Sequence, residues 1–290
     1  MYNERSETLK KIKKRFLFTL IAIIALVFFF YFQNNSIVIT ESTISSKRIP
    51  ASFNDYKIVQ LSDLHSKTFG NRQNVLVEKV SNTNPDLIVF TGDLVDSKNY
   101  NEDTSLNLIR ELIHIAPIYF VTGNHEWWSG KFDILEKELN DIGVKVLRNT
   151  NDVISKGDEK IQIIGIDDPA YVNDSYTERS ITEGAIENSV EGMEDDYFKI
   201  LLSHRPEFLS IYSKYGIDVV FSGHAHGGQV RIPFVGGLVA PNQGFLPKYT
   251  AGKFDLDNTS MFVNRGLGNS TIPLRIFNRP EIIVLTLSRS

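Results

Sequence analysis

Cysteine is absent from this chain of 290 residues. Its absence excludes a zinc site built from thiolates, a catalytic thiol and a disulfide framework. Any bound metal must therefore be held by His, Asp, Glu or Asn side chains. A chain without cysteine is compatible with either side of a membrane, because it requires neither a reducing nor an oxidising compartment.

Positive charge is scarce outside the N-terminal region. Residues 1–50 contain eight Lys or Arg and three Asp or Glu, which leaves 23 basic and 32 acidic residues in the rest of the chain. A protein that grips nucleic acid through its phosphates carries a broad basic surface. We therefore expect no nucleic-acid partner.

Residues 16–32 contain no charged side chain, and a basic cluster that extends from Lys10 to Arg15 precedes them. At about 1.5 Å per residue the apolar run is slightly short for a hydrocarbon core of about 30 Å, and flanking residues extend it. No small-x-small cleavage site follows closely and the twin-arginine pair is missing, which favours an uncleaved signal anchor over a removed signal peptide or a buried core helix. Because positive flanks stay in the cytoplasm, the remainder of the chain should be extracytoplasmic.

These features predict a single-pass protein of the cell membrane, divided into four segments. Residues 1–15 form a basic cytoplasmic segment, and residues 16–33 form the transmembrane signal anchor. Residues 34–52, rich in Ser, Thr and Asn, form a tether. Residues 53–290 form one α/β domain, since a chain of this length can bury one large core and no repeat interrupts it.

Polar side chains recur at the ends of successive strands in the first half of the domain. β-branched and aromatic segments alternate with helical patterns and predict strands at residues 56–61, 86–90 and 117–121. Asp63, Asp93 and Asn124 follow these strands at intervals of 30 and 31 residues, about one strand-helix unit each. In α/β sheets the carboxyl ends of the strands meet at one rim, where ligands bind. We therefore expect the three side chains to share a site.

The second half of the domain predicts another sheet. Shorter strands are expected at residues 144–147, 153–155, 161–166, 198–202 and 219–221. Residues 167–196 are polar and acidic with a weak helical pattern and are interpreted as a surface excursion, and residues 207–215 as a helix. The later two strands deliver His204 and the pair His224 and His226. Imidazole is a common nitrogen ligand of zinc, manganese and iron, so these histidines indicate a metal site without selecting the ion.

Five blocks of the chain stand in the order and spacing of the calcineurin-like metallophosphoesterases. They are Asp63-x-His65, Gly92-Asp93-x-x-Asp96, Gly123-Asn124-His125-Glu126, His204 and Gly223-His224-x-His226. The C-terminal part, including Asn264-Arg265-Gly266-Leu267-Gly268, resembles the membrane-anchored YkuE/YaeI-type subgroup. The resemblance extends over residues 56–287 and implies a four-layer α-β-β-α sandwich of two mixed sheets.

The same resemblance implies a centre of two divalent metal ions, which are manganese, iron or zinc. Carried over by position, one metal takes Asp63, His65 and His226, and the other takes Asn124, His204 and His224. Asp93 bridges them, which suits a carboxylate with two oxygens. A metal-bridging hydroxide then attacks phosphorus, and His125 is the catalytic residue that stabilises or protonates the departing oxygen.

Other residues of these blocks have less specific roles. Asp96 and Glu126 are expected to orient ligands or cap helices, because outer carboxylates commonly orient metal-bound histidines. Arg205 and Arg265 are candidates for binding substrate phosphate, although arginine also forms surface ion pairs. The adjacent Trp127 and Trp128 form a substrate platform, a lip on the membrane or ordinary packing.

The leading functional hypothesis is a membrane-anchored phosphoesterase that hydrolyses a phosphodiester or pyrophosphate in a lipid-linked or envelope substrate. A non-catalytic metal-binding scaffold in the cell envelope is the alternative from another class, and the presence of His125 argues against it. A nuclease or a phosphomonoesterase of the same superfamily is a further alternative. The expected partners are therefore a phosphorylated small molecule or lipid and the membrane that receives the N-terminal helix.

Overall fold

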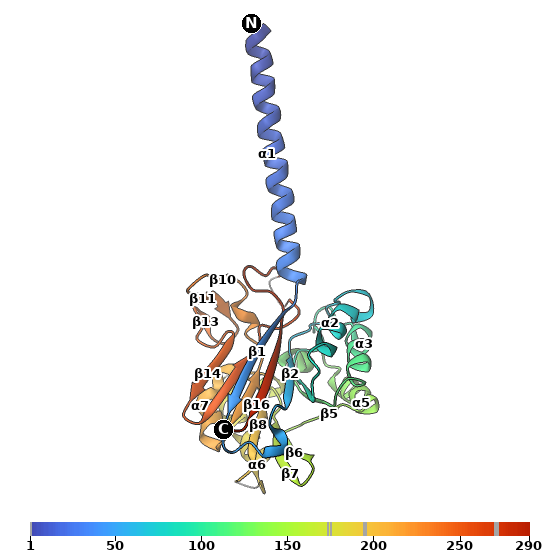
Figure 1. Ribbon diagram of the computed structural model, residues 1–290, viewed down its shortest axis with the longest axis vertical. Coiled ribbons are helices and arrows are strands. Elements are labelled where there is room, and N and C mark those ends of the chain that lie inside the picture. The colour runs from blue at the N-terminus through green and yellow to red at the C-terminus, as the bar shows by residue number, and fades with distance from the viewer. Residues whose placement is uncertain (1, 173, 175, 194–195, 270–272) are drawn as a thin grey trace.

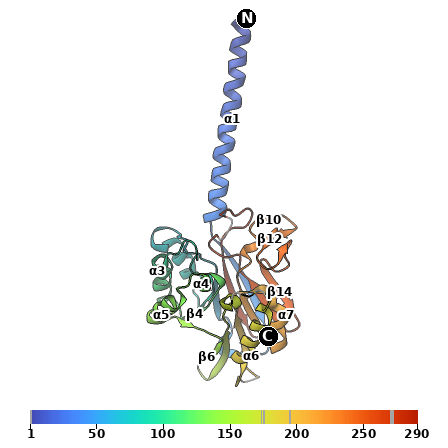
Figure 2. The same cartoon turned by 180° about the vertical axis from the view of Figure 1, so that it is seen from behind.

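A computed structural model describes residues 2–172, 174, 176–193, 196–269 and 273–290 of the chain. Its first element, α1 (Tyr2–Asn35), stands away from the remainder of the molecule (Figures 1 and 2). Residues 6–35 of α1 have a mean hydropathy of 2.4 in their most apolar window, and almost none of that window is buried. By length and composition this helix can cross a membrane.

The first sheet combines parallel strands with one reversal. Its strands lie in the order β1-β16-β2-β3-β4-β5. They are β1 (Val38–Ser45), β16 (Glu281–Ser288), β2 (Lys57–Leu61), β3 (Leu87–Thr91), β4 (Ile118–Val121) and β5 (Lys145–Val146). β1 pairs in parallel with β16, β16 pairs antiparallel with β2, and β2 to β5 are parallel.

The second sheet has the order β14-β15-β9-β8-β7-β6 among the described residues. Its strands are β14 (Gly252–Leu256), β15 (Thr259–Val263), β9 (Val219–Ser222), β8 (Phe198–Leu202), β7 (Glu159–Gly165) and β6 (Thr150–Lys156). Two hairpins lie outside it, with strands β10 (Arg231–Ile232), β11 (Gly236–Gly237), β12 (Val239–Ala240) and β13 (Gly244–Phe245).

Successive side chains of a strand point to opposite faces of the sheet, and apolar side chains are buried on both faces. In β3, Leu87 and Val89 pack between the two sheets, whereas Ile88 and Phe90 face the helices of the first sheet. That helical layer contains α2 (Asn74–Ser81), α3 (Glu102–Leu112) and α5 (Phe132–Ile142), while α6 (Glu178–Val190) and α7 (Leu209–Tyr212) cover the second sheet. The fold is therefore the expected four-layer sandwich.

The strand directions place the carboxyl ends of β2, β3 and β4 beside α1. β1 begins at Val38, directly after α1, and runs away from it. Because β16 is parallel to β1 and β2 is antiparallel to β16, β2 runs back toward α1, and β3 and β4 run with it. The end of the sandwich that carries the predicted ligands is thus the end joined to α1.

One prediction from the sequence is wrong, and another is incomplete. The tether expected over residues 34–52 is instead part of the domain, because β1 pairs with β16 over eight residues and Ile49 is buried in the core between the sheets. The surface excursion expected over residues 167–196 contains α6, whose Ala185 and Ile186 are buried against the second sheet.

Candidate metal centre

Every predicted ligand follows the carboxyl end of a strand by two to four residues. Asp63 and His65 come after β2, Asp93 after β3, Asn124 after β4, His204 after β8, and His224 and His226 after β9. All seven side chains are buried and are at most 6% exposed. The fold therefore brings all seven to one rim, which the spacing predicts for Asp63, Asp93 and Asn124.

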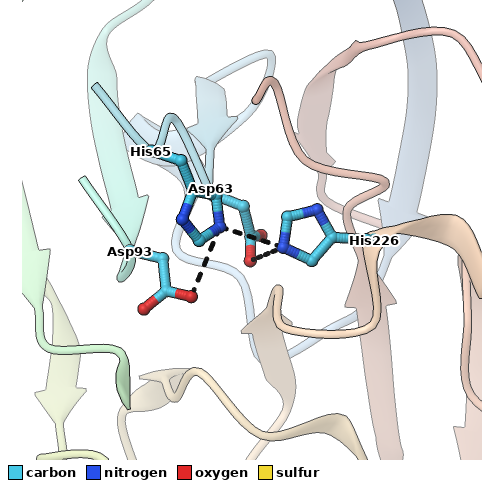
Figure 3. Close-up of side chains that lie close together, drawn as sticks. All are labelled: Asp63, His65, Asp93 and His226. Carbon is cyan, nitrogen blue, oxygen red and sulfur yellow. Dashed lines mark hydrogen bonds and ion pairs between the residues drawn. The ribbon is translucent and has the colours of Figure 1, made fainter. Parts of the chain in front are cut away.

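The first group of ligand atoms is Asp63, His65, Asp93 and His226, which point toward one another in Figure 3. The Nε2 atoms of His65 and His226 lie 3.0 Å apart. Oδ1 of Asp63 lies 3.3 Å from Nε2 of His226, and Oδ2 of Asp93 lies 3.5 Å from Nε2 of His65. Two carboxylates and two imidazoles converge here, which is a donor set for a divalent cation.

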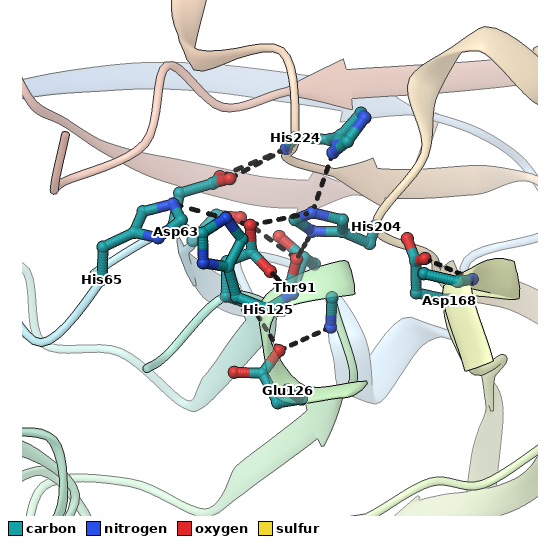
Figure 4. Close-up of polar contacts among 12 residues, drawn as sticks. Asp63, His65, Thr91, His125, Glu126, Asp168, His204 and His224 are labelled. Atoms are coloured by element: carbon teal, nitrogen blue, oxygen red, sulfur yellow. Dashed lines mark hydrogen bonds and ion pairs between the residues drawn. The ribbon is translucent and has the colours of Figure 1, made fainter. Parts of the chain in front are cut away.

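The second group of ligand atoms begins at the same oxygen of Asp93. Its Oδ2 lies 3.4 Å from Nε2 of His204, which in turn lies 3.2 Å from Nδ1 of His224. Oδ1 of Asn124 is buried without a hydrogen-bond partner in the described part of the chain. The other carboxylate oxygen of Asp93 accepts the backbone N–H of His125 at 2.8 Å. Asp93 is thus held in place and faces both groups with one oxygen. Figure 4 shows the rings of His204 and His224 facing each other.

Neighbouring acceptors fix which imidazole nitrogen points into the centre. Nδ1 of His204 lies 2.7 Å from the carbonyl oxygen of Thr91, so it donates its hydrogen there and leaves the Nε2 lone pair free. Nδ1 of His65 lies 3.6 Å from Oδ2 of Asp96, which favours the same tautomer. Partners of this kind orient metal-bound histidines.

His125 lies beside the centre and contributes to the wall of a pocket of about 410 Å³. The backbone N–H of Ser97 donates to Nδ1 of His125 at 3.0 Å, so Nε2 is the atom that carries the proton of the neutral ring. Burial lowers the pKa of His125, and Asp93 opposes this effect. An imidazole in this position can donate a proton to an oxygen in the pocket.

Burial and charge act in opposite directions on the ligands. Burial lowers the pKa values of His224 and His226 well below the usual range, so both rings are neutral and can bind a cation. Burial also lowers the pKa of His204, but the nearby carboxylates of Asp93, Asp63 and Asp168 together outweigh burial and raise that pKa to about 10. Burial raises the pKa of Asp63. Acidic groups buried this deeply require positive charge nearby, which a bound metal supplies.

The backbone around the centre is strained. Five predicted ligands have left-handed φ angles between 46° and 66°, namely Asp63, His65, Asp93, His224 and His226. Such conformations are costly for these residue types and cluster at functional sites. Glu126 helps to hold them, because its carboxylate accepts the backbone N–H groups of Asp93, Val95 and Gly123 at 2.7 to 3.2 Å.

Glycines allow the loops to approach one another. A Cβ atom on Gly123 would lie 2.3 Å from Oδ1 of Asp93, and one on Gly223 would lie 2.0 Å from Oγ of Ser62 and 2.5 Å from Oδ2 of Asp63. Neither approach is possible for a residue with a side chain. The glycines of the Gly-Asn-His-Glu and Gly-His-x-His motifs therefore set the separation of the ligands.

The two candidate phosphate-binding arginines are bound to carboxylates instead of facing the pocket. Arg205 is 2% exposed, and its Nε and Nη2 donate to Asp168 at 2.6 and 2.9 Å. Nη2 of Arg265 donates to Glu281 at 2.7 Å. Neither arginine is among the described residues that line the pocket.

The pocket also contains residues that the motifs did not reveal. Its polar lining includes Ser97, Lys98, Asn99 and Asn242, and Trp128 forms part of its rim. Ser97, Lys98 and Asn99 directly follow Asp96 in the sequence. This position next to a motif is the one sequence signal that could have indicated them. Asn242 lies in the distant turn between β12 and β13, and no motif marks it.

The residues present fit a divalent cation. Oδ1 of Asn124 is buried without a hydrogen-bond partner in the described part of the chain, and the Nε2 atoms of His65 and His226 face each other at 3.0 Å. Nitrogen and oxygen donors of these types suit manganese, iron and zinc. The buried cluster of Asp and His is therefore able to bind metal.

Comparisons with known proteins agree with this geometry. The family model described as calcineurin-like phosphoesterase matches residues 56–228. An uncharacterized metallophosphoesterase of Bacillus subtilis, YkuE, is 33% identical over 89% of this chain and 87% of its own length. A bovine transmembrane protein with a metallophosphoesterase domain is 30% identical over 86% of this chain and 56% of its own length.

A solved dimetal phosphatase from Danio rerio superposes on 74% of this chain and 88% of its own, with a TM-score of 0.43 and 10% identity. The match of the family model covers more than half of the chain, and it spans the loops that carry all seven predicted ligands. The chain therefore belongs to the calcineurin-like metallophosphoesterases and is a metal-dependent phosphoesterase.

Proposed function

We propose that this protein is a membrane-anchored phosphoesterase with two metal ions, which hydrolyses a phosphodiester or pyrophosphate bond in a lipid-linked or envelope substrate. The observation that carries the proposal is the position of Asp93. Its Oδ2 atom lies 3.5 Å from the ligand nitrogen of His65 and 3.4 Å from that of His204, so a single oxygen serves both ligand groups. A shared carboxylate of this kind is typical of two-metal sites.

Seven side chains would hold the two ions. The first ion takes Asp63, His65 and His226, the second takes Asn124, His204 and His224, and Asp93 contributes to both. When bound, such a pair of cations polarises a phosphoryl oxygen and lowers the pKa of water to near neutrality.

His125 would act on the leaving group. Its Nε2 carries the proton because Ser97 donates to Nδ1, and its ring lines the pocket in which a phosphoester would lie. Protonation of the departing oxygen by a positioned imidazole contributes about 10² to 10⁴ in rate. Lys98 and Asn99, at the same pocket wall, supply positive charge and hydrogen bonds for the phosphate oxygens.

The anchor supports a substrate that belongs to a membrane. Helix α1 is long and apolar enough to span a bilayer, and a basic cluster precedes it. We place the N-terminus in the cytoplasm and the domain outside, following the distribution of positive charge. Asp93, Asn124 and His125 line the pocket and lie at the end of the domain that is joined to α1. Lipid head groups would be within reach there.

Purified full-length protein in detergent micelles, supplied with manganese and bis-p-nitrophenyl phosphate, tests the chemistry. We expect hydrolysis by the native protein, loss of at least about 100-fold for His125→Ala, and a greater loss for Asp93→Asn. His114→Ala is the matched control, because His114 is an exposed histidine outside the centre. Equal rates in all four proteins would leave the non-catalytic scaffold as the better description, and preference for a monoester would identify a phosphomonoesterase.

A further inference from the structure

Seven large apolar side chains are exposed on the described loops beyond the second sheet. They belong to the β10–β11 hairpin, the β12–β13 hairpin and the segment before β16, and we call them the apolar rim: Ile232, Phe234, Val235, Phe245, Leu246, Leu274 and Phe277. Phe234 is fully exposed and Phe245 is 78% exposed. Backbone hydrogen bonds from Arg231 to Ile276 and from Leu246 to Leu238 join these loops. Exposed apolar side chains gathered on neighbouring loops mark a partner or a membrane.

The apolar rim is continuous with the membrane helix. The ring of Phe277 packs edge to face on Phe29 of α1, with the ring centroids 5.7 Å apart. Next to it, the guanidinium of Arg279 lies over the ring of Phe32 at 4.7 Å and donates to the hydroxyl of Ser36. Figures 1 and 2 both show the β10 hairpin beside the base of α1.

The apolar rim is also continuous with the mouth of the pocket. Pro241 and Asn242, in the turn of the β12–β13 hairpin, line the pocket, and Phe245 and Leu246 follow them on the same hairpin. Pro273 lines the pocket as well, four residues before Phe277. The same loops thus carry pocket residues and exposed apolar side chains.

The charge of this region differs from that of the remaining domain. Residues 219–254 and 258–280 contain no Asp or Glu, although the whole chain has a net charge of −4. Lys248 is exposed within the first of these stretches. Glu178 of α6, which accepts a hydrogen bond from Asn242, is an acidic group that borders these stretches. A surface that is mainly apolar and basic in places is complementary to anionic lipid head groups.

We infer that the apolar rim inserts into the leaflet that receives α1, so that the domain lies on the bilayer with its pocket open to the head-group layer. This inference depends on the proposed membrane anchoring of α1. Two attachments fix the orientation of the domain, whereas a single helix would leave it free to rotate. The substrate is then a phosphoester or pyrophosphate in the head group of a lipid in the same bilayer.

The natural lack of cysteine permits a direct test in the full-length protein. Single variants Phe234→Cys and Phe245→Cys are spin-labelled in vesicles of phosphatidylcholine and phosphatidylglycerol. Collisions of each label with dioxygen, which concentrates in lipid, are compared with collisions with a water-soluble nickel chelate. Val27→Cys in α1 reports the anchor, and Asp158→Cys reports the β6–β7 turn at the opposite end of the domain.

The inference is supported if the labels at 234 and 245 have the same accessibility to dioxygen and nickel as the label at 27. Their accessibility to nickel should then be at least fivefold lower than that of the label at 158. Labels at 234 and 245 that resemble the label at 158, while the label at 27 stays in lipid, would overturn it and leave the anchor intact. A label at 27 in water would overturn the anchor as well, whatever the hydrolysis assay shows. Dipolar broadening between labels at 234 would indicate a second copy of the chain on this face and would also overturn the inference.

Discussion

The Nε2 atoms of His65 and His226 lie 3.0 Å apart in the interior of the domain. The two residues come from loops 161 positions apart, so the fold itself creates this contact. Asp96 favours the tautomer of His65 whose Nε2 is an acceptor, and Nδ1 of His226 has no partner in the described part of the chain. A cation between the facing nitrogens makes use of both lone pairs. We therefore expect metal binding, stability and activity to depend on the geometry of these loops.

Asp93→Asn should reduce the metal content from two ions per chain to one or fewer. The amide offers a single neutral oxygen in place of a charged carboxylate that faces both ligand groups. Inductively coupled plasma mass spectrometry on protein dialysed against manganese measures the change. Asp158→Asn, on the exposed β6–β7 turn, is the control and should keep two ions. Two ions in the Asp93 variant would show that another group joins the sites.

Removal of metal should lower the melting temperature of the native protein. A ligand at a hundred times its dissociation constant stabilises the folded state by about 2.7 kcal/mol, and in a domain of this size each kcal/mol corresponds to about 2–4 °C. We therefore expect a chelator to lower the melting temperature by about 5–10 °C for each ion removed. Differential scanning calorimetry measures this change. Asp93→Asn should show a smaller fall. An unchanged melting temperature would argue that the cluster is stable without metal.

The ligand-bearing core of the fold was predictable because its signals are local. Strands β2, β3 and β4 are rich in β-branched and aromatic residues, and a polar residue or a glycine follows each of them. The spacing of Asp63, Asp93 and Asn124 then requires only the rule that parallel strands end at one rim. Resemblance to the family supplied the assignment of each ligand to an ion, which spacing alone does not determine.

The elements that sequence reasoning missed depend on distant partners. Among the described residues, the polar strand β1 pairs with β16, which lies more than 240 residues later. The composition of β1 alone therefore resembles that of a tether. α6 has a weak apolar face because it buries only a few side chains against the second sheet. Arg205 resembles a phosphate ligand in sequence, and only the fold reveals Asp168 beside it.

Gly223→Ala should weaken metal binding although Gly223 is not a ligand. The added Cβ would lie 2.0 Å from Ser62 and 2.5 Å from Asp63, so the Asp63 carboxylate must move. We expect at least a tenfold rise in the manganese dissociation constant, measured by isothermal titration calorimetry. Gly184→Ala in α6 is the matched control, since no atom lies within 4 Å of its new Cβ. It should stabilise the helix by about 0.5–1 kcal/mol. Equal manganese affinities of the Gly223→Ala variant and the native protein would show that the loop moves without displacing the Asp63 carboxylate.

Asp168→Asn should destabilise the protein strongly. The mutation leaves the buried guanidinium of Arg205 opposite a neutral amide, and removal of one partner of a buried ion pair costs about 3–5 kcal/mol. Glu178 and Glu207, each 3.6 Å from Arg205, should keep the loss near the lower value. Urea unfolding measures it, and Glu183→Gln, which breaks the exposed pair with Lys214, should cost less than about 1 kcal/mol. An unchanged stability with an altered KM would restore Arg205 as a substrate ligand.

Trp127 and Trp128 are adjacent but should respond to alanine in different ways. The ring of Trp127 packs on Phe132 and Tyr171 and its Nε1 donates to Thr122, so Trp127→Ala should lower the free energy of unfolding by about 3 kcal/mol.

Trp128 is 56% exposed, lies 5.4 Å from the ring of His125 and lines the pocket, so it can contact the organic part of a phosphoester. Loss of an aromatic contact worth about 1 kcal/mol should raise KM for bis-p-nitrophenyl phosphate about fivefold and leave kcat nearly constant. Urea unfolding and steady-state kinetics on both variants separate the two effects. A large loss of stability in the Trp128 variant, with KM unchanged, would mean that this ring serves packing and that the pocket recognises its substrate through polar groups alone.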